Sequence, residues 1–82
     1  MDYDLVLNML GISGRLLQPG EYGQLEGQVE DDEFLVAVKD ETEVVFIQSI
    51  ADFRLVRHGE DVEYYAIPVF VVLNIKPPAP IV

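Results

Sequence analysis

The chain has no cysteine and a single histidine among its 82 residues. Without cysteine, neither a disulfide bond nor a thiolate metal site can stabilise the fold. The histidine, His58, has no second histidine at metal-binding spacing, so we interpret it as a residue that flanks a turn. The absence of cysteine fits a reducing compartment, and we expect a cytoplasmic protein.

Basic residues are also scarce. Five Lys and Arg residues stand against fifteen Asp and Glu residues, which gives a net charge of −10. Negative charge repels the phosphates of nucleic acids, so we expect no direct binding to DNA or RNA. The same charge attracts a basic partner and steers its approach.

Long apolar runs are missing too. The longest run, Ala66 to Leu73, is interrupted by Pro68 and is far too short to span a bilayer. The first residues, MDYD, contain no basic segment of the kind that begins a signal peptide. We therefore expect no membrane partner.

The length of the chain predicts one small domain over residues 1–76 and a Pro-rich tail over residues 77–82. A chain of this size removes only about 60–65% of its unfolded surface from water, so its stability margin is modest. Association of several copies would widen that margin. The tail, KPPAPIV from Lys76, favours polyproline II and is expected either to form a linker or to dock on a neighbouring molecule.

The most informative stretch contains two short apolar runs, Phe34 to Val38 and Val44 to Ile47. Both runs are rich in β-branched and aromatic residues, and both are too short for an ordinary helix. Because side chains alternate along a strand, each run offers apolar residues to both faces of a sheet. Polar residues separate the runs, which predicts a hairpin that turns at Asp40 to Thr42.

The N-terminal segment Asp2 to Leu10 favours a short helix, because its apolar residues recur at i, i+3, i+4 and i+7 from Tyr3. Asp2 is placed to cap the start of this helix and Gly11 lies just past its end. A strand is the alternative, since alternate residues from Leu5 to Met9 are also apolar.

Strands are expected elsewhere, joined by tight acidic turns at about ten-residue spacing. The expected strands are Tyr22 to Val29, Phe53 to His58, Val62 to Ile67 and Val69 to Ile75. Together these elements predict a mainly β fold, a five- or six-stranded antiparallel meander or barrel of the size of SH3-like or Sm-like barrels, with one short N-terminal helix. The residues that mark the Sm family are absent, and architecture alone does not indicate function.

Carboxylates are concentrated in the turns. In a meander, alternate turns lie at the same end, so two acidic turns are expected to share one rim. The residues of this expected rim are Asp40, Glu41, Glu43, Glu60, Asp61 and Glu63. One interpretation is that acids fill turns for solubility and protect strand edges. The functional interpretation is a surface that docks a basic partner or imitates a phosphate backbone.

Other kinds of site find little support. The acidic run from Glu30 to Glu33 lacks the spaced ligands and glycine of a calcium loop. Ser13 and Ser49 lie outside any nucleophile-elbow pattern, and the glycines match no phosphate-binding loop. We therefore expect no catalytic, cofactor-binding or metal-binding residues, and no enzyme. The residues expected at an interface outside the rim are Tyr64, Tyr65, Pro77, Pro78 and Pro80.

These features predict a non-enzymatic acidic protein-interaction module, a subunit or adaptor of a larger phage or bacterial assembly that associates with itself or with a protein partner. One alternative is an acidic inhibitor of a nucleic-acid-handling protein, of the kind that phages and mobile elements encode. Another is an oligomer that binds or sequesters a small anion through Arg54, Arg57 or Lys76.

Overall fold

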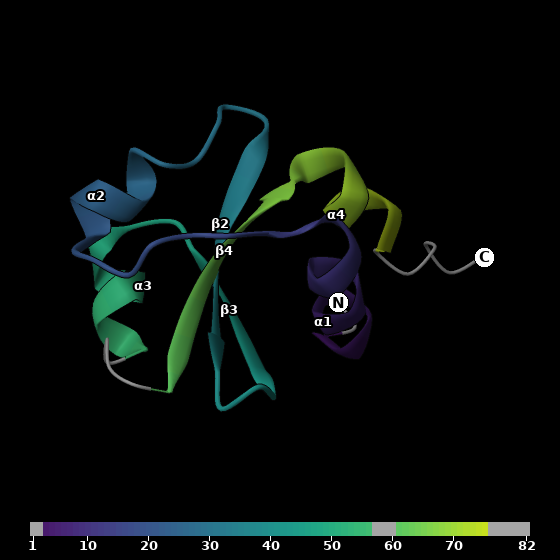
Figure 1. Ribbon diagram of the computed structural model, residues 1–82, viewed down its shortest axis with the longest axis horizontal. Helices are drawn as coiled ribbons and strands as arrows, with labels where there is room; N and C mark the ends of the chain where they lie inside the picture. The colour runs from purple at the N-terminus through teal and green to yellow at the C-terminus, as the bar shows by residue number, and fades with distance from the viewer. Residues whose placement is uncertain (1–2, 57–60, 76–82) are drawn as a thin grey trace, which may run out of the picture.

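The computed structural model describes residues 3–56 and 61–75 (Figure 1). Four helices and four strands lie in this part of the chain. In order they are α1 (Tyr3–Ser13), β1 (Arg15–Leu16), α2 (Tyr22–Glu26), β2 (Glu33–Lys39), β3 (Glu43–Ile47), α3 (Ile50–Leu55), β4 (Val62–Pro68) and α4 (Val69–Ile75). None of the helices in the described ranges is long and apolar enough to cross a membrane.

The four strands form one antiparallel sheet in the order β1-β4-β2-β3. The central strand β2 pairs with β4 on one side and with β3 on the other, so that Ala37 lies between Tyr64 and Val45. Strands β1 and β3 form the two edges of this sheet.

The hairpin expected at Asp40 to Thr42 is confirmed, because β2 and β3 pair in antiparallel register around it. The backbone N–H of Thr42 donates to the carbonyl of Lys39 at 3.1 Å. Asp40 and Glu41 both have positive φ, at 54° and 62°, as the central residues of a type I′ turn require. Such turns match the right-handed twist of the strands that they connect.

Helices cover both faces of the sheet, so the molecule has three layers (Figure 1). On one face, Leu25 of α2 and Phe53 of α3 pack against Leu35, Ala37 and Tyr64. The buried residues of the other face come from α1, α4 and the strands, and they are Val6, Leu10, Val36, Val38, Val44, Ile67, Val71 and Val72. The two-sided apolar pattern of β2 follows from this double cover, since both faces of the strand are shielded from water.

The expected five- or six-stranded barrel is not confirmed, because the sheet of the described residues has four strands and two edges. Two segments expected as strands, at residues 22–29 and 69–75, contain the helices α2 and α4, and α3 covers the first three residues of a third, at 53–58. Ser49 explains α3: its hydroxyl accepts the N–H of Asp52 and caps the helix. Pro68 ends β4 because it has no N–H for the ladder, and α4 follows at once.

The N-terminal helix is confirmed, but it extends beyond Gly11 to Ser13. The close approach at its end occurs at Gly14, whose N–H donates to the carbonyl of Leu10 at 3.0 Å. A Cβ at Gly14 would lie 2.6 Å from that carbonyl oxygen, so no larger residue fits without a backbone shift. The expected cap, Asp2, lies outside the described residues.

Candidate functional site: an acidic rim and an adjoining groove

The acidic turns meet because β4 runs antiparallel to β2. The start of β4 therefore lies beside the end of β2, where Lys39 is paired with Val62. One residue further on, the N–H of Asp40 donates to the carbonyl of Asp61 at 2.9 Å. Backbone pairing thus fixes the distance between the β2–β3 turn and the start of β4.

Four carboxylates surround a hollow of 340 Å³ at this end of the sheet. They are Asp40, Glu41, Asp61 and Glu63, which we call the acidic rim. All four side chains are exposed. Of the other two residues expected here, Glu43 lies at the start of β3 and does not line the hollow, and Glu60 lies outside the described residues.

The acidic rim has no cationic partner within residues 3–56 and 61–75: no Lys or Arg there forms an ion pair with any of its carboxylates. The nearest basic residue in sequence, Lys39, is half-buried at the end of β2. Four negative charges at this end of the sheet repel one another, and solvent and salt reduce this repulsion only in part. A partner that supplies positive charge would relieve it.

An apolar groove adjoins the rim, between α1 and the sheet. It has a volume of 290 Å³ and is lined by Leu7, Leu10, Gly11, Val38, Glu41, Glu63 and Tyr65. We call it the α1 groove. It shares Glu41 and Glu63 with the rim, so these two carboxylates separate an acidic hollow from an apolar one.

Tyr65 lies where the groove meets the rim. Its ring is half-buried, and its hydroxyl donates to a carboxylate oxygen of Glu63 at 3.3 Å. Burial raises the pKa of Tyr65 above the ordinary value of 10.0, and the neighbouring charges of Glu63 and Glu41 raise this pKa further. The neighbouring Tyr64 points to the opposite face, is 1% exposed and packs its ring 5.5 Å from that of Phe53. It therefore belongs to the hydrophobic core.

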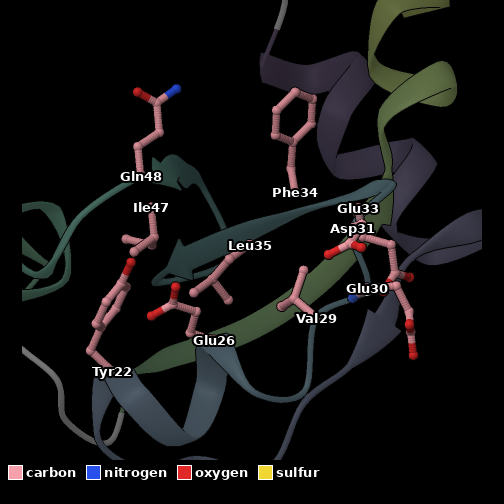
Figure 2. A pocket seen from close by; sticks show the side chains of 10 residues that line it. All are labelled: Tyr22, Glu26, Val29, Glu30, Asp31, Glu33, Phe34, Leu35, Ile47 and Gln48. Atoms are coloured by element: carbon pink, nitrogen blue, oxygen red, sulfur yellow. Dashed lines mark hydrogen bonds between the residues drawn. The ribbon is translucent and has the colours of Figure 1, made fainter.

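The opposite end of the sheet holds a larger hollow, of 390 Å³, between α2 and the adjoining ends of β2 and β3 (Figure 2). Here Tyr22 rises from α2 toward Ile47, and Glu30, Asp31 and Glu33 gather at the start of β2. Glu33 forms an ion pair with Arg15, with 2.6 Å between Oε1 and Nη2. The same carboxylate oxygen accepts the backbone N–H of Glu30 at 2.9 Å.

A metal-binding arrangement is not found in the described part of the chain. No group of three or more His, Asp or Glu side chains there is placed to hold a metal ion. Ser49 is engaged in the cap of α3 through Asp52. His58, Arg57, Lys76 and the tail prolines Pro77, Pro78 and Pro80 lie outside the described residues.

Sequence reasoning identified the acids of the rim but missed the groove. The apolar face of α1, with Leu7 and Leu10, was visible in the sequence, as was the alternation of Tyr64 and Tyr65 between the two faces of a strand. What could not be seen was that α1 lies across the sheet beside the rim. No protein-family model, curated protein or solved structure matches this chain.

Proposed function

We propose that this protein is a non-enzymatic interaction module, a subunit or adaptor that binds a basic partner through its acidic rim. The observation that carries the proposal is the convergence of Asp40, Glu41, Asp61 and Glu63 on one hollow with no cation among the described residues to neutralise them. Clustered charge on a rigid support speeds encounter with an oppositely charged surface and selects against partners of like charge.

The backbone of the turn supports the proposal. Asp40 and Glu41 occupy positions of positive φ, where Gly and Asn are favoured and where a Glu side chain is costly. Asp tolerates positive φ, so the cost falls on Glu41, which lowers the stability of the hairpin relative to a glycine at the same position. A role for the negative charge in binding accounts for that cost, whereas solubility alone could be supplied by acids at unstrained positions.

Proteins that bind nucleic acid are one class of basic partner. If the partner belongs to this class, the acidic rim would act as an inhibitor that imitates the phosphates of nucleic acid. The rim carboxylates are exposed and held by paired strands, which suits such imitation. Competition between this protein and duplex DNA for a DNA-binding partner would identify this inhibitory function.

The test uses a labelled cationic peptide, KSKSKSK, and fluorescence anisotropy over a range of salt concentrations. The rim variant D40N/E41Q/D61N/E63Q removes four charges from the rim. The matched control, E21Q/E30Q/D31N/D32N, removes four charges from exposed side chains elsewhere. We expect the rim variant to lose about tenfold in affinity and most of the salt dependence, since close charge pairs dominate such binding.

The control variant is expected to retain most of the affinity. Equal losses in the two variants would mean that net charge, and not the rim, attracts the peptide. Such a result, or the absence of salt-dependent binding to the unmodified protein, would overturn the proposal. Circular dichroism of both variants establishes that they remain folded.

A further inference from the structure

We infer that the α1 groove receives an apolar side chain from the basic segment that the acidic rim binds. The inference rests on the proposed function and specifies its partner: a segment in which Lys or Arg stands next to a residue such as Leu, Ile or Met. The groove would hold the apolar side chain, and the rim would hold its basic neighbours.

The shape of the groove supports an apolar occupant. Its floor consists of Leu10 and Val38, which are 4% and 5% exposed, and its walls include the half-buried Leu7 and Tyr65. An apolar side chain placed here would bury its own surface and the remaining exposed surface of this lining.

Gly11 keeps one wall of the groove open. It lies inside α1, two residues before the end of the helix, where glycine is less favourable than alanine by about 0.5–1 kcal/mol. A Cβ at Gly11 would have no heavy atom within 4 Å, and its φ is not positive, so neither space nor backbone geometry demands glycine. Gly14, by contrast, is required, because a Cβ added there would lie 2.6 Å from the carbonyl oxygen of Leu10. Access to the groove is the feature that Gly11 supplies.

Charge selects the kind of occupant. Glu41 and Glu63 stand between the groove and the rim, so a ligand that fills the groove passes next to two carboxylates. A second copy of this chain also carries a net charge of −10 and would be repelled. Lys and Arg combine an apolar stem with a cationic head, so basic residues beside an apolar one fit both hollows.

The experiment compares two labelled peptides of equal charge, KSKLKSK and KSKSKSK, which differ by one Leu-to-Ser replacement. We expect the Leu peptide to bind the unmodified protein about fivefold more tightly, since partial burial of a Leu side chain contributes on the order of 1 kcal/mol. Gly11→Leu fills the groove from α1 and should abolish this preference while leaving the affinity for the Ser peptide unchanged.

Gly23→Leu is the matched control, because Gly23 is an exposed helical glycine of α2 that also has no heavy atom within 4 Å of an added Cβ. This variant should retain the preference for the Leu peptide. Amide chemical-shift changes caused by the Leu peptide should centre on Gly11, Val38 and Tyr65, which locates the side chain without any substitution.

The outcomes separate the two proposals. If both peptides bind the unmodified protein equally and depend on the rim, the proposed function stands and the groove inference is wrong. If the Leu preference survives Gly11→Leu, or the shift changes lie elsewhere, the groove is not the site and the inference is also overturned. If neither peptide shows rim-dependent binding, the proposed function itself fails.

Discussion

The two ends of the sheet carry similar numbers of carboxylates and use them differently. Where β2 begins, Glu33 binds Arg15 and the N–H of Glu30, and nearby Asp52 accepts the N–H of Gln48 at 2.9 Å. These acids connect segments of the fold. Where β2 ends, the acidic rim surrounds a hollow and forms no ion pair with the described residues.

The comparison shows that acidic composition alone does not distinguish a structural carboxylate from one available to a partner. What distinguishes them is the number of donors that each carboxylate oxygen accepts within the chain. A carboxylate that accepts backbone N–H groups contributes to folding, and its removal leaves those groups unpaired. An exposed carboxylate that accepts no backbone N–H contributes little to folding and is available to bind a partner. Among the described residues, the rim carboxylates are of this kind, and Glu63 accepts only the hydroxyl of Tyr65.

The largest effect is expected for Glu33→Ala. Glu33 is only 12% exposed and its Oε1 accepts both the Arg15 guanidinium and the N–H of Glu30. Its loss should lower the free energy of unfolding by about 2 kcal/mol, because the N–H of Glu30 and the guanidinium of Arg15 lose a charged acceptor, and hydrogen bonds to a charged group contribute more than neutral ones. Urea denaturation measures the change. Asp31→Ala, at an exposed neighbour, is the control, and an equal effect of the two substitutions would remove the distinction between the ends.

A smaller loss, about 1 kcal/mol, is expected for Asp52→Ala, since it removes one half of the reciprocal cap of α3. Asp52 accepts the N–H of Gln48 and lies 3.4 Å from the hydroxyl of Ser49, while its own N–H donates to that hydroxyl. Thermal melting followed by circular dichroism measures the loss. Asp52→Asn keeps an accepting oxygen and should recover more than half of the stability; no recovery would indicate that charge, and not the cap, is what matters.

The central hairpin was predicted from the sequence and the helix α3 was not. In the hairpin, two β-branched runs flank a polar turn, so local propensity and pairing agree. In α3, the apolar residues after Asp52 suggested a strand, although the Ser49-x-x-Asp52 pattern is a known signal for a helix start. The capping signal was present, but the alternating apolar residues that favour a strand outweighed it.

The remaining differences depend on tertiary packing. The segment of α4 is apolar and seven residues long, a length at which periodicity does not separate a buried strand from a buried helix. Its packing with α1 decides the outcome, through Val71 and Val72. The rim was expected from its acids, whereas the α1 groove depends on where α1 lies over the sheet, which no local pattern encodes.

The turn between β2 and β3 should become more stable when the residue at a position of positive φ is replaced by glycine. Glu41→Gly is expected to raise the free energy of unfolding by about 0.5 kcal/mol, because glycine adopts positive φ without the cost that a Cβ imposes. Glu43→Gly, at an exposed position of β3, removes the same charge and should lower stability, since glycine weakens a strand. Parallel urea denaturation of both variants tests this. If Glu41→Gly destabilises the protein, the Glu41 side chain supports the fold and the rim resembles the opposite end.

The smallest effect is a shift in the titration of Tyr65. Burial raises its pKa above 10.0, and Glu63 and Glu41 raise it further. The folded protein therefore retains this proton at pH values where the unfolded chain has lost it, so Tyr65 contributes stability below about pH 10 that is lost as pH rises through the folded pKa. E41Q/E63Q should lower the pKa of Tyr65 only in part, because the larger cause, burial, remains.

The ultraviolet absorbance of tyrosinate follows this titration, and Tyr65→Phe identifies the contribution of Tyr65. Burial raises the pKa of Tyr64, which lies on the opposite face of the sheet from Glu63, so its titration should not respond to E41Q/E63Q and provides an internal reference. An unchanged pKa of Tyr65 in E41Q/E63Q would mean that solvent screens the rim carboxylates from their nearest aromatic neighbour. A cationic partner would then gain equally little from them, because the interaction that raises the pKa of Tyr65 is the interaction that would hold a Lys or Arg at the same place.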